Sequence, residues 1–106
     1  MTKIVLKDTR KTEVVELPSF PGSRVELYDG LLFGQIKQIE KAQSNFDRGV
    51  MTLIFLIKDW NFTDENGKKL PVEERVLNSF PAQDLTFLLR KATKILEEAQ
   101  KKTKKS

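Results

Sequence analysis

Residues 45–60 read N-F-D-R-G-V-M-T-L-I-F-L-I-K-D-W, and this stretch decides the fold. Its apolar residues recur at helical spacing: Val50, Leu53, Ile54 and Ile57. The spacing continues as far as Trp60, so we predict a helix that begins near Ser44 and ends near Trp60. A buried strand over Met51–Ile57 is the alternative. A helix with so wide an apolar face is central in a core or buries a second face in a partner.

A second long helix is predicted downstream, from Pro81 to Lys102. Proline suits the first turn of a helix, and Asp84 suits the positive end of the helix dipole. Apolar residues form one stripe along this helix: Leu85, Leu88, Leu89, Ala92, Ile95, Leu96 and Ala99. We expect this stripe to pack in the core of the domain, and a contact with another chain is the alternative.

Upstream of these helices the sequence is rich in β-branched residues. Lys3–Lys7 and Thr12–Leu17 both favour strands, and the polar residues 8–11 between them have the length of a hairpin turn. Arg24–Tyr28 favours a third strand, because Val25 and Leu27 alternate with polar positions. A helix is then expected from Asp29 onward.

Between the two long helices lies a polar loop at residues 61–69, with the turn dipeptide Asn66-Gly67. A short helix is expected from about Pro71 to Asn78. The predicted fold class is therefore α+β and mainly helical, with a small N-terminal antiparallel β-hairpin or three-stranded sheet followed by about four helices. We expect a single domain over residues 1–100, with strands within 3–28, helices within 30–100, and a disordered Lys-rich tail at 101–106.

The composition argues against several kinds of function. The chain has 106 residues with neither cysteine nor histidine, which excludes disulfides and the histidine-based catalytic triads. The net charge of +4 comes from residues 91–106, which carry six lysines against two glutamates. A nucleic-acid interface usually has a basic stripe on the fold itself, so nucleic-acid binding is not expected. No apolar stretch approaches the roughly 18 residues of a membrane span.

No constellation of residues indicates catalysis or a bound metal. Residues 59–66 are rich in oxygen ligands, but a calcium loop starting at Asp59 would need glycine at Asp64 and glutamate at Leu70. The adjacent glutamate pairs point apart on a helix, so they do not converge on a substrate. We expect no enzyme activity, no catalytic residues, no metal site and no cofactor.

The segment K-D-W-N-F-T-D-E-N-G-K-K-L-P-V at residues 58–72 resembles one found in small tail assembly chaperones of long-tailed bacteriophages. In that family a helix ends at a tryptophan, and a T-D-E-(D/N)-G turn, an L-P pair and a short helix follow. A second proline then opens a helix with an acid and a leucine near its start. Residues 79–85, S-F-P-A-Q-D-L, fit this last feature.

The resemblance implies a non-catalytic chaperone in the host bacterial cytoplasm during virion morphogenesis. Its expected partners are the phage or prophage tape-measure protein and, in addition, the tail tube protein, while self-association stays open. Two alternatives remain: a structural or tail-completion protein retained in the virion, and a small nucleic-acid-associated protein that uses the Lys-rich C-terminus. The expected binding surface is apolar area on the two long helices: Phe55, Leu56, Trp60, Leu88, Leu89, Ile95 and Leu96.

Overall fold

A computed structural model of the chain describes residues 2–104, with side chains as far as Lys101. Three strands form an antiparallel sheet in the order β1-β2-β3. The strands are β1 (Thr12–Val15), β2 (Val25–Tyr28) and β3 (Ile57–Trp60). The helices of the described part are α1 (Phe33–Glu40), α2 (Asn45–Leu56), α3 (Glu74–Leu77) and α4 (Ala82–Lys104). This arrangement confirms the predicted α+β class.

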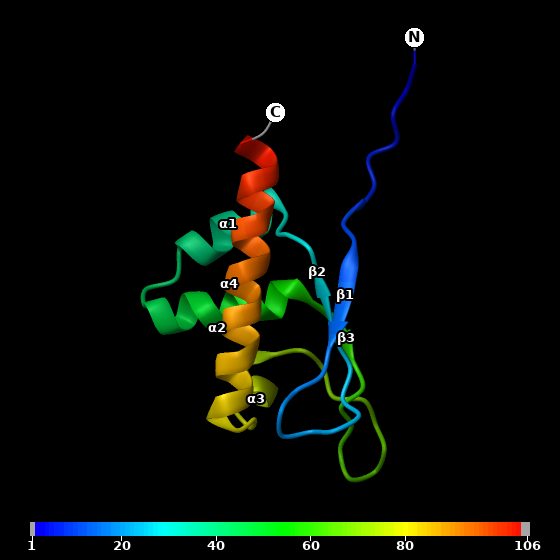
Figure 1. The fold of residues 1–106 in the computed structure, drawn as a ribbon, viewed down its shortest axis with the longest axis vertical. Coiled ribbons are helices and arrows are strands. Elements are labelled where there is room, and N and C mark those ends of the chain that lie inside the picture. Colours follow the sequence, from blue (N-terminus) through cyan, green and yellow to red (C-terminus); the bar gives the residue numbers. More distant parts are fainter. Residues whose placement is uncertain (1, 105–106) are drawn as a thin grey trace.

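The helices form a layer beside the sheet (Figure 1). The long helix α4 runs along the longest axis of the molecule, and α2 crosses it. Helix α2 contacts α1, α3 and α4, and it continues directly into β3. Helix α2 therefore has a central position in the core, which is the first of the two possibilities that its wide apolar face leaves open.

The core lies between the sheet and the helices. Its buried side chains come from every layer: Leu17, Val25, Leu27, Val50, Leu53, Leu56, Ile57, Trp60, Val76, Leu77, Leu88, Ala92 and Ile95. A cluster of aromatic rings extends the core beneath the polar loop: Phe20, Trp60, Phe62 and Phe80. The indole N–H of Trp60 donates to the carbonyl of Leu70 at 2.7 Å, which ties the end of the loop to β3.

The helix predicted from near Ser44 to near Trp60 is too long, because α2 ends at Leu56 and the next four residues form β3. The sheet has an irregular register between Glu26 and Leu27, so that Ile57 lies opposite Leu27 and Trp60 opposite Val25. This bulge brings Ile57 and Trp60, which are three residues apart, to the same buried face. The same spacing fits one face of a helix, which is why the sequence pattern is ambiguous here.

The predicted strand at Lys3–Lys7 is wrong as well, since residues 2–7 carry no secondary structure. In the structure β1 pairs with β2, from Thr12 opposite Tyr28 to Val15 opposite Val25. The segment before β1 extends away from the body of the molecule (Figure 1). Arg10 prevents a turn at residues 8–11, because its guanidinium lies 3.7 Å above the Tyr28 ring and donates to the carbonyl of Gly30.

The turns and caps follow from local chemistry. Helix α2 is capped by Ser44, whose hydroxyl accepts the backbone N–H of Asp47 at 3.0 Å. Gly67 has a φ of 81°, which confirms the predicted turn, and Asp64 accepts the N–H groups of Asn66 and Lys68 within it. The polar loop is therefore closed by the side chain of Asp64, together with the backbone hydrogen bond from the Asp64 N–H to the Lys68 carbonyl at 2.9 Å.

The other element boundaries differ modestly from the prediction. Helix α1 begins at Phe33 rather than near Asp29, and α3 is confined to Glu74–Leu77. Helix α4 confirms the long C-terminal helix and extends to Lys104. The predicted disordered tail falls partly on residues 105 and 106, which lie outside the described residues.

Candidate functional site

An apolar groove of about 390 Å³ lies where α2, the end of α3 and the start of α4 meet. We call it the α2–α4 groove. Helix α2 lines it with residues at positions i, i+3, i+4 and i+7, namely Phe46, Gly49, Val50 and Leu53. Helix α4 lines it with the same spacing: Ala82, Leu85, Thr86 and Leu89. Two helical faces therefore flank the groove, each about two turns, or about 10 Å, long.

Gly49 allows α2 and α4 to approach each other closely at the rim of the groove. A methyl group at this position would lie 3.1 Å from Cδ2 of Leu89, closer than an ordinary van der Waals contact. The absence of a side chain therefore allows α2 to approach Leu89 closely. At the rim, Phe46 is 71% exposed and Leu89 is 36% exposed, so apolar surface faces the solvent on both helices.

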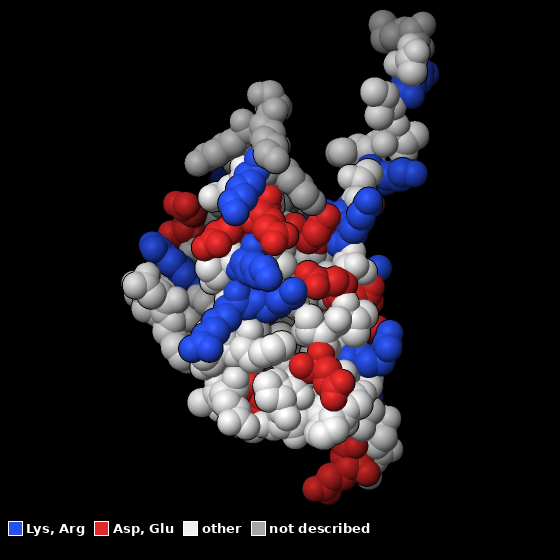
Figure 2. Space-filling view, viewed as in Figure 1, with Lys and Arg blue, Asp and Glu red and all other residues white. Residues whose placement is uncertain are grey.

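The groove is uncharged. Its polar lining residues are Asn45, Asn78 and Thr86. None of the described residues that line it has an acidic or basic side chain. Figure 2 shows a largely uncharged area toward the end of the molecule where α3 lies. A groove of this kind favours an apolar partner, because burying a charged group without a counter-charge is costly.

The middle of α4 has a mixed charge. It carries Arg90, Lys91 and Lys94, which are followed by Glu97 and Glu98. Figure 2 shows basic side chains over this part of the helix with acidic side chains next to them. Lys91 pairs with Glu13 of β1 at 3.1 Å, which joins the helix to the sheet. The described surface seen in this view therefore lacks the continuous basic stripe typical of nucleic-acid interfaces.

A second hollow of about 430 Å³ lies between α1 and the C-terminal half of α4. Leu31, Ile36 and Ile39 line it from the side of α1, and Leu96 lines it from α4. Glu40 also lines it, so this hollow is less uniformly apolar than the α2–α4 groove.

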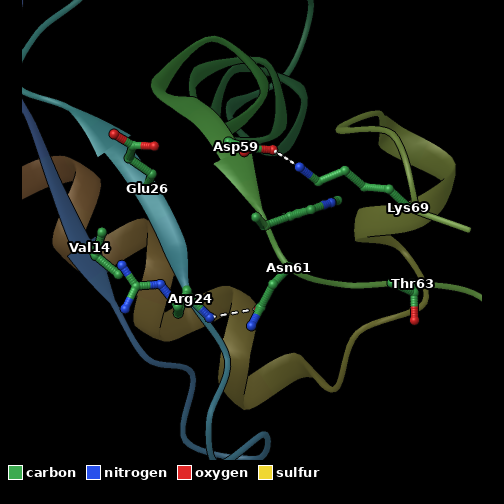
Figure 3. A pocket seen from close by; sticks show the side chains of 8 residues that line it. Val14, Arg24, Glu26, Asp59, Asn61, Thr63 and Lys69 are labelled. Atoms are coloured by element: carbon green, nitrogen blue, oxygen red, sulfur yellow. Dashed lines mark hydrogen bonds and ion pairs between the residues drawn. The ribbon is translucent and has the colours of Figure 1, made fainter. Parts of the chain in front are cut away.

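A third hollow, of about 290 Å³, lies on the outer face of the sheet (Figure 3). Asp59 and Lys69 point toward each other and form an ion pair at 2.5 Å. This hydrogen bond from Lys69 holds the pKa of the Asp59 carboxyl below its ordinary value. Glu26 accepts the hydroxyl of Thr12 at 2.6 Å. Both carboxylates of this hollow are thus already bound by neighbouring side chains.

The structure separates the seven residues predicted to bind a partner. Leu56, Trp60, Leu88 and Ile95 are buried in the core, so they present almost no surface. Phe55 is half-buried and lines none of the three hollows above. Leu89 lines the α2–α4 groove, and the half-buried Leu96 lines the hollow beside α1.

Phe46, Gly49 and Leu85 line the groove but were not among the predicted binding residues. A signal for all three is present in the sequence, since Leu85 belongs to the predicted apolar stripe of the C-terminal helix. Phe46 and Gly49 precede Val50 and Leu53 at helical spacing, so the apolar face of α2 extends back to its first turn. What the spacing does not reveal is that α4 leaves this first turn uncovered.

Within residues 2–104, no group of three or more carboxylates, histidines or cysteines lies close enough together to hold a metal ion. In the same residues, none of the helices combines the length and the apolar character needed to cross a membrane.

No family model, curated protein or solved structure matches the chain. One structural feature that the resemblance implies differs, because α2 ends at Leu56, four residues before Trp60. The turn at Asn66-Gly67 and the helix that follows Pro81 are present.

Proposed function

We propose that the protein is a tail assembly chaperone of a long-tailed bacteriophage, which binds the tape-measure protein in the host bacterial cytoplasm. The observation that carries this proposal is the α2–α4 groove, which two helices line with mostly small and apolar side chains and which has no charged residue in its described lining. A groove of this kind accepts the apolar face of an amphipathic helix.

The chemistry of the groove suits a helical segment of a long protein that is not yet assembled. Such a segment exposes leucine-like side chains at a spacing of three and four residues until it packs in the tail. In the groove, these side chains would contact Phe46 on one side and Leu89 on the other. Binding keeps the segment out of contact with other copies, which is the role of a chaperone, and requires no catalysis.

The segment at residues 58–85 supports the same function through its resemblance to the chaperone family. Recruitment of the tail tube protein is part of the proposal on the same ground. The mixed charge of α4 gives no support to the nucleic-acid alternative, and nothing in the groove favours a protein that stays in the virion.

The test is affinity capture of the tagged protein from lysate of an induced or infected host, treated with nuclease and read by mass spectrometry. The expected result is recovery of a very long, helical tape-measure protein. Recovery of tube or capsid proteins without the tape-measure protein would favour a structural role. Material that disappears on nuclease treatment would contradict the proposal and return attention to the lysines at the C-terminus.

A further inference from the structure

The N-terminal segment, residues 2–7, has the sequence T-K-I-V-L-K and makes no hydrogen bond or ion pair with the rest of the described chain. We call it the arm. It stands away from the body of the molecule as a continuation of β1 (Figures 1 and 2). Three consecutive apolar residues are exposed in it, Ile4 at 91%, Val5 at 80% and Leu6 at 97%. An extended segment rich in β-branched residues favours a strand, and here it has no strand beside it.

The sheet of the same molecule has an edge with unpaired backbone N–H and carbonyl groups, to which such a segment can pair. Strand β1 is at the edge of the sheet, and no described strand pairs with its outer side. The N–H of Asp29 donates to the carbonyl of Lys11 at 2.9 Å, so Lys11, Glu13 and Val15 face β2 in the alternating antiparallel pattern. The N–H and carbonyl groups of Thr12 and Val14 therefore point away from the sheet. Such an edge is a template for a further strand.

Arg10 keeps the arm from folding back onto the β1 strand of its own chain. Its guanidinium lies over the Tyr28 ring, donates to the carbonyl of Gly30 at 3.0 Å and pairs with Asp8 at 2.7 Å. These contacts hold residues 8–11 straight along the end of β2. A hairpin turn at residues 8–11 would have to break them, so the arm does not reach the edge of its own strand.

We propose that the arm of one copy pairs as a strand with the outer edge of β1 in a second copy of this chain. Six residues in extended form span about 20 Å, which is enough to cover the four-residue edge of β1. The charges favour this pairing, because Lys3 and Lys7 flank the apolar residues of the arm and the exposed Glu16 follows β1. Glu13 within β1 already pairs with Lys91 of its own chain. Reciprocal exchange of two arms gives a closed dimer, the smallest assembly that leaves no arm and no β1 edge unpaired.

The proposal does not rest on the function of the groove, which lies on α2 and α4. The full chain, studied by light scattering after size-exclusion chromatography over a dilution series, is expected to approach twice the 12.2 kDa chain mass as the concentration rises. Hydrogen exchange at the amides of residues 3–7 is expected to slow as the concentration rises. A chain that stays monomeric at the highest concentration would overturn the proposal.

Two variants test the two sides of the proposed contact, the arm and the edge of β1, one at a time. Deletion of residues 2–7 removes the arm, and Val14→Pro removes an outward N–H from the edge without removing a hydrogen bond to β2. Each is expected to weaken self-association at least about tenfold. Phe33→Ser, which removes an exposed apolar side chain of α1, is the control and is expected to change nothing.

Folding of each variant is checked by the fluorescence of Trp60, which is buried in the core. Self-association that persists in both variants would place the interface elsewhere. Loss in only one of the two variants would contradict the pairing of the arm with β1.

Discussion

Asp84 is a fully buried carboxylate at the start of α4. Its Oδ1 accepts the backbone N–H of Ser19 at 3.0 Å, which ties the loop between β1 and β2 to this helix. Its Oδ2 has no hydrogen-bond partner among the described residues. The side chain therefore joins two segments that are far apart in the sequence, at the cost of one unsatisfied oxygen.

Asp84→Ala is expected to lower the free energy of unfolding by about 1–3 kcal/mol, because the Ser19 N–H loses its acceptor. Asp84→Asn is expected to lose less, since it keeps an oxygen for Ser19 and avoids a buried carboxylate. Urea unfolding followed by Trp60 fluorescence measures both. Equal losses in the two variants would show that the hydrogen bond to Ser19 is not the important contribution.

Asp8 carries a pH-dependent contact at the base of the arm. Its hydrogen bonds with Arg10 lower the pKa of the carboxyl from 3.8 to about 2. Because the folded-state pKa is depressed, the contact stabilises the structure fully above the ordinary carboxyl pKa and is lost as the pH falls through about 2. We therefore expect the arm to keep its orientation at any pH above about 4.

The measurement is an NMR titration of the Asp8 side chain in the wild-type chain and in Arg10→Ala. The wild-type pKa should be about 2, and the variant value should return toward 3.8. A wild-type pKa near 3.8 would contradict the contact that holds residues 8–11 straight.

Among the helices, α2 has a glycine in its interior. Gly49→Ala should raise the free energy of unfolding by about 0.5–1 kcal/mol, because alanine favours the helix. The added methyl group would lie 3.1 Å from Cδ2 of Leu89, but Leu89 is partly exposed and can shift. Thermal unfolding checks this expectation. A loss of stability above about 1 kcal/mol would mean that Leu89 is held rigidly against α2.

The sequence predicts the type of most elements but not the position of the third strand. Strands β1 and β2 and the long helices α2 and α4 follow from the spacing of apolar residues. Strand β3 does not, because the bulge opposite Glu26 gives Ile57 and Trp60 a spacing that also fits a helix. The position of the arm depends on Arg10 stacking on Tyr28, a contact between distant residues that no local pattern encodes.

The candidate site was less predictable than the fold. The apolar stripe of α4 is divided by its neighbours, so that Leu88, Ala92 and Ile95 enter the core while Leu89 remains at the rim of the groove. Spacing shows that these residues share a broad face of the helix. Only the crossing of α2 over α4 determines which of them stays accessible.

At the scale of the whole molecule, two separate surfaces are proposed to bind different partners. The α2–α4 groove is uncharged and is proposed to bind the tape-measure protein, whereas the arm and the edge of β1 are proposed to join copies of the chain. Because these surfaces lie on different elements, a variant of one should leave the other unaffected. Deletion of residues 2–7 is thus expected to leave capture of the tape-measure protein by the groove in place.

The central claim is that the groove binds the tape-measure protein, and Leu89→Glu tests it most directly. The substitution places a charge at the rim of an uncharged groove, at a partly exposed helical position where glutamate is tolerated. Phe33→Glu introduces the same charge at an exposed apolar residue of α1 and is the matched control.

The measurement is the amount of tape-measure protein that co-purifies with each tagged variant when the two proteins are expressed together. If the groove binds the tape-measure protein, recovery decreases at least about tenfold for Leu89→Glu and stays at the wild-type level for Phe33→Glu. Equal recovery with Leu89→Glu and the wild-type chain, with both variants folded, would contradict it.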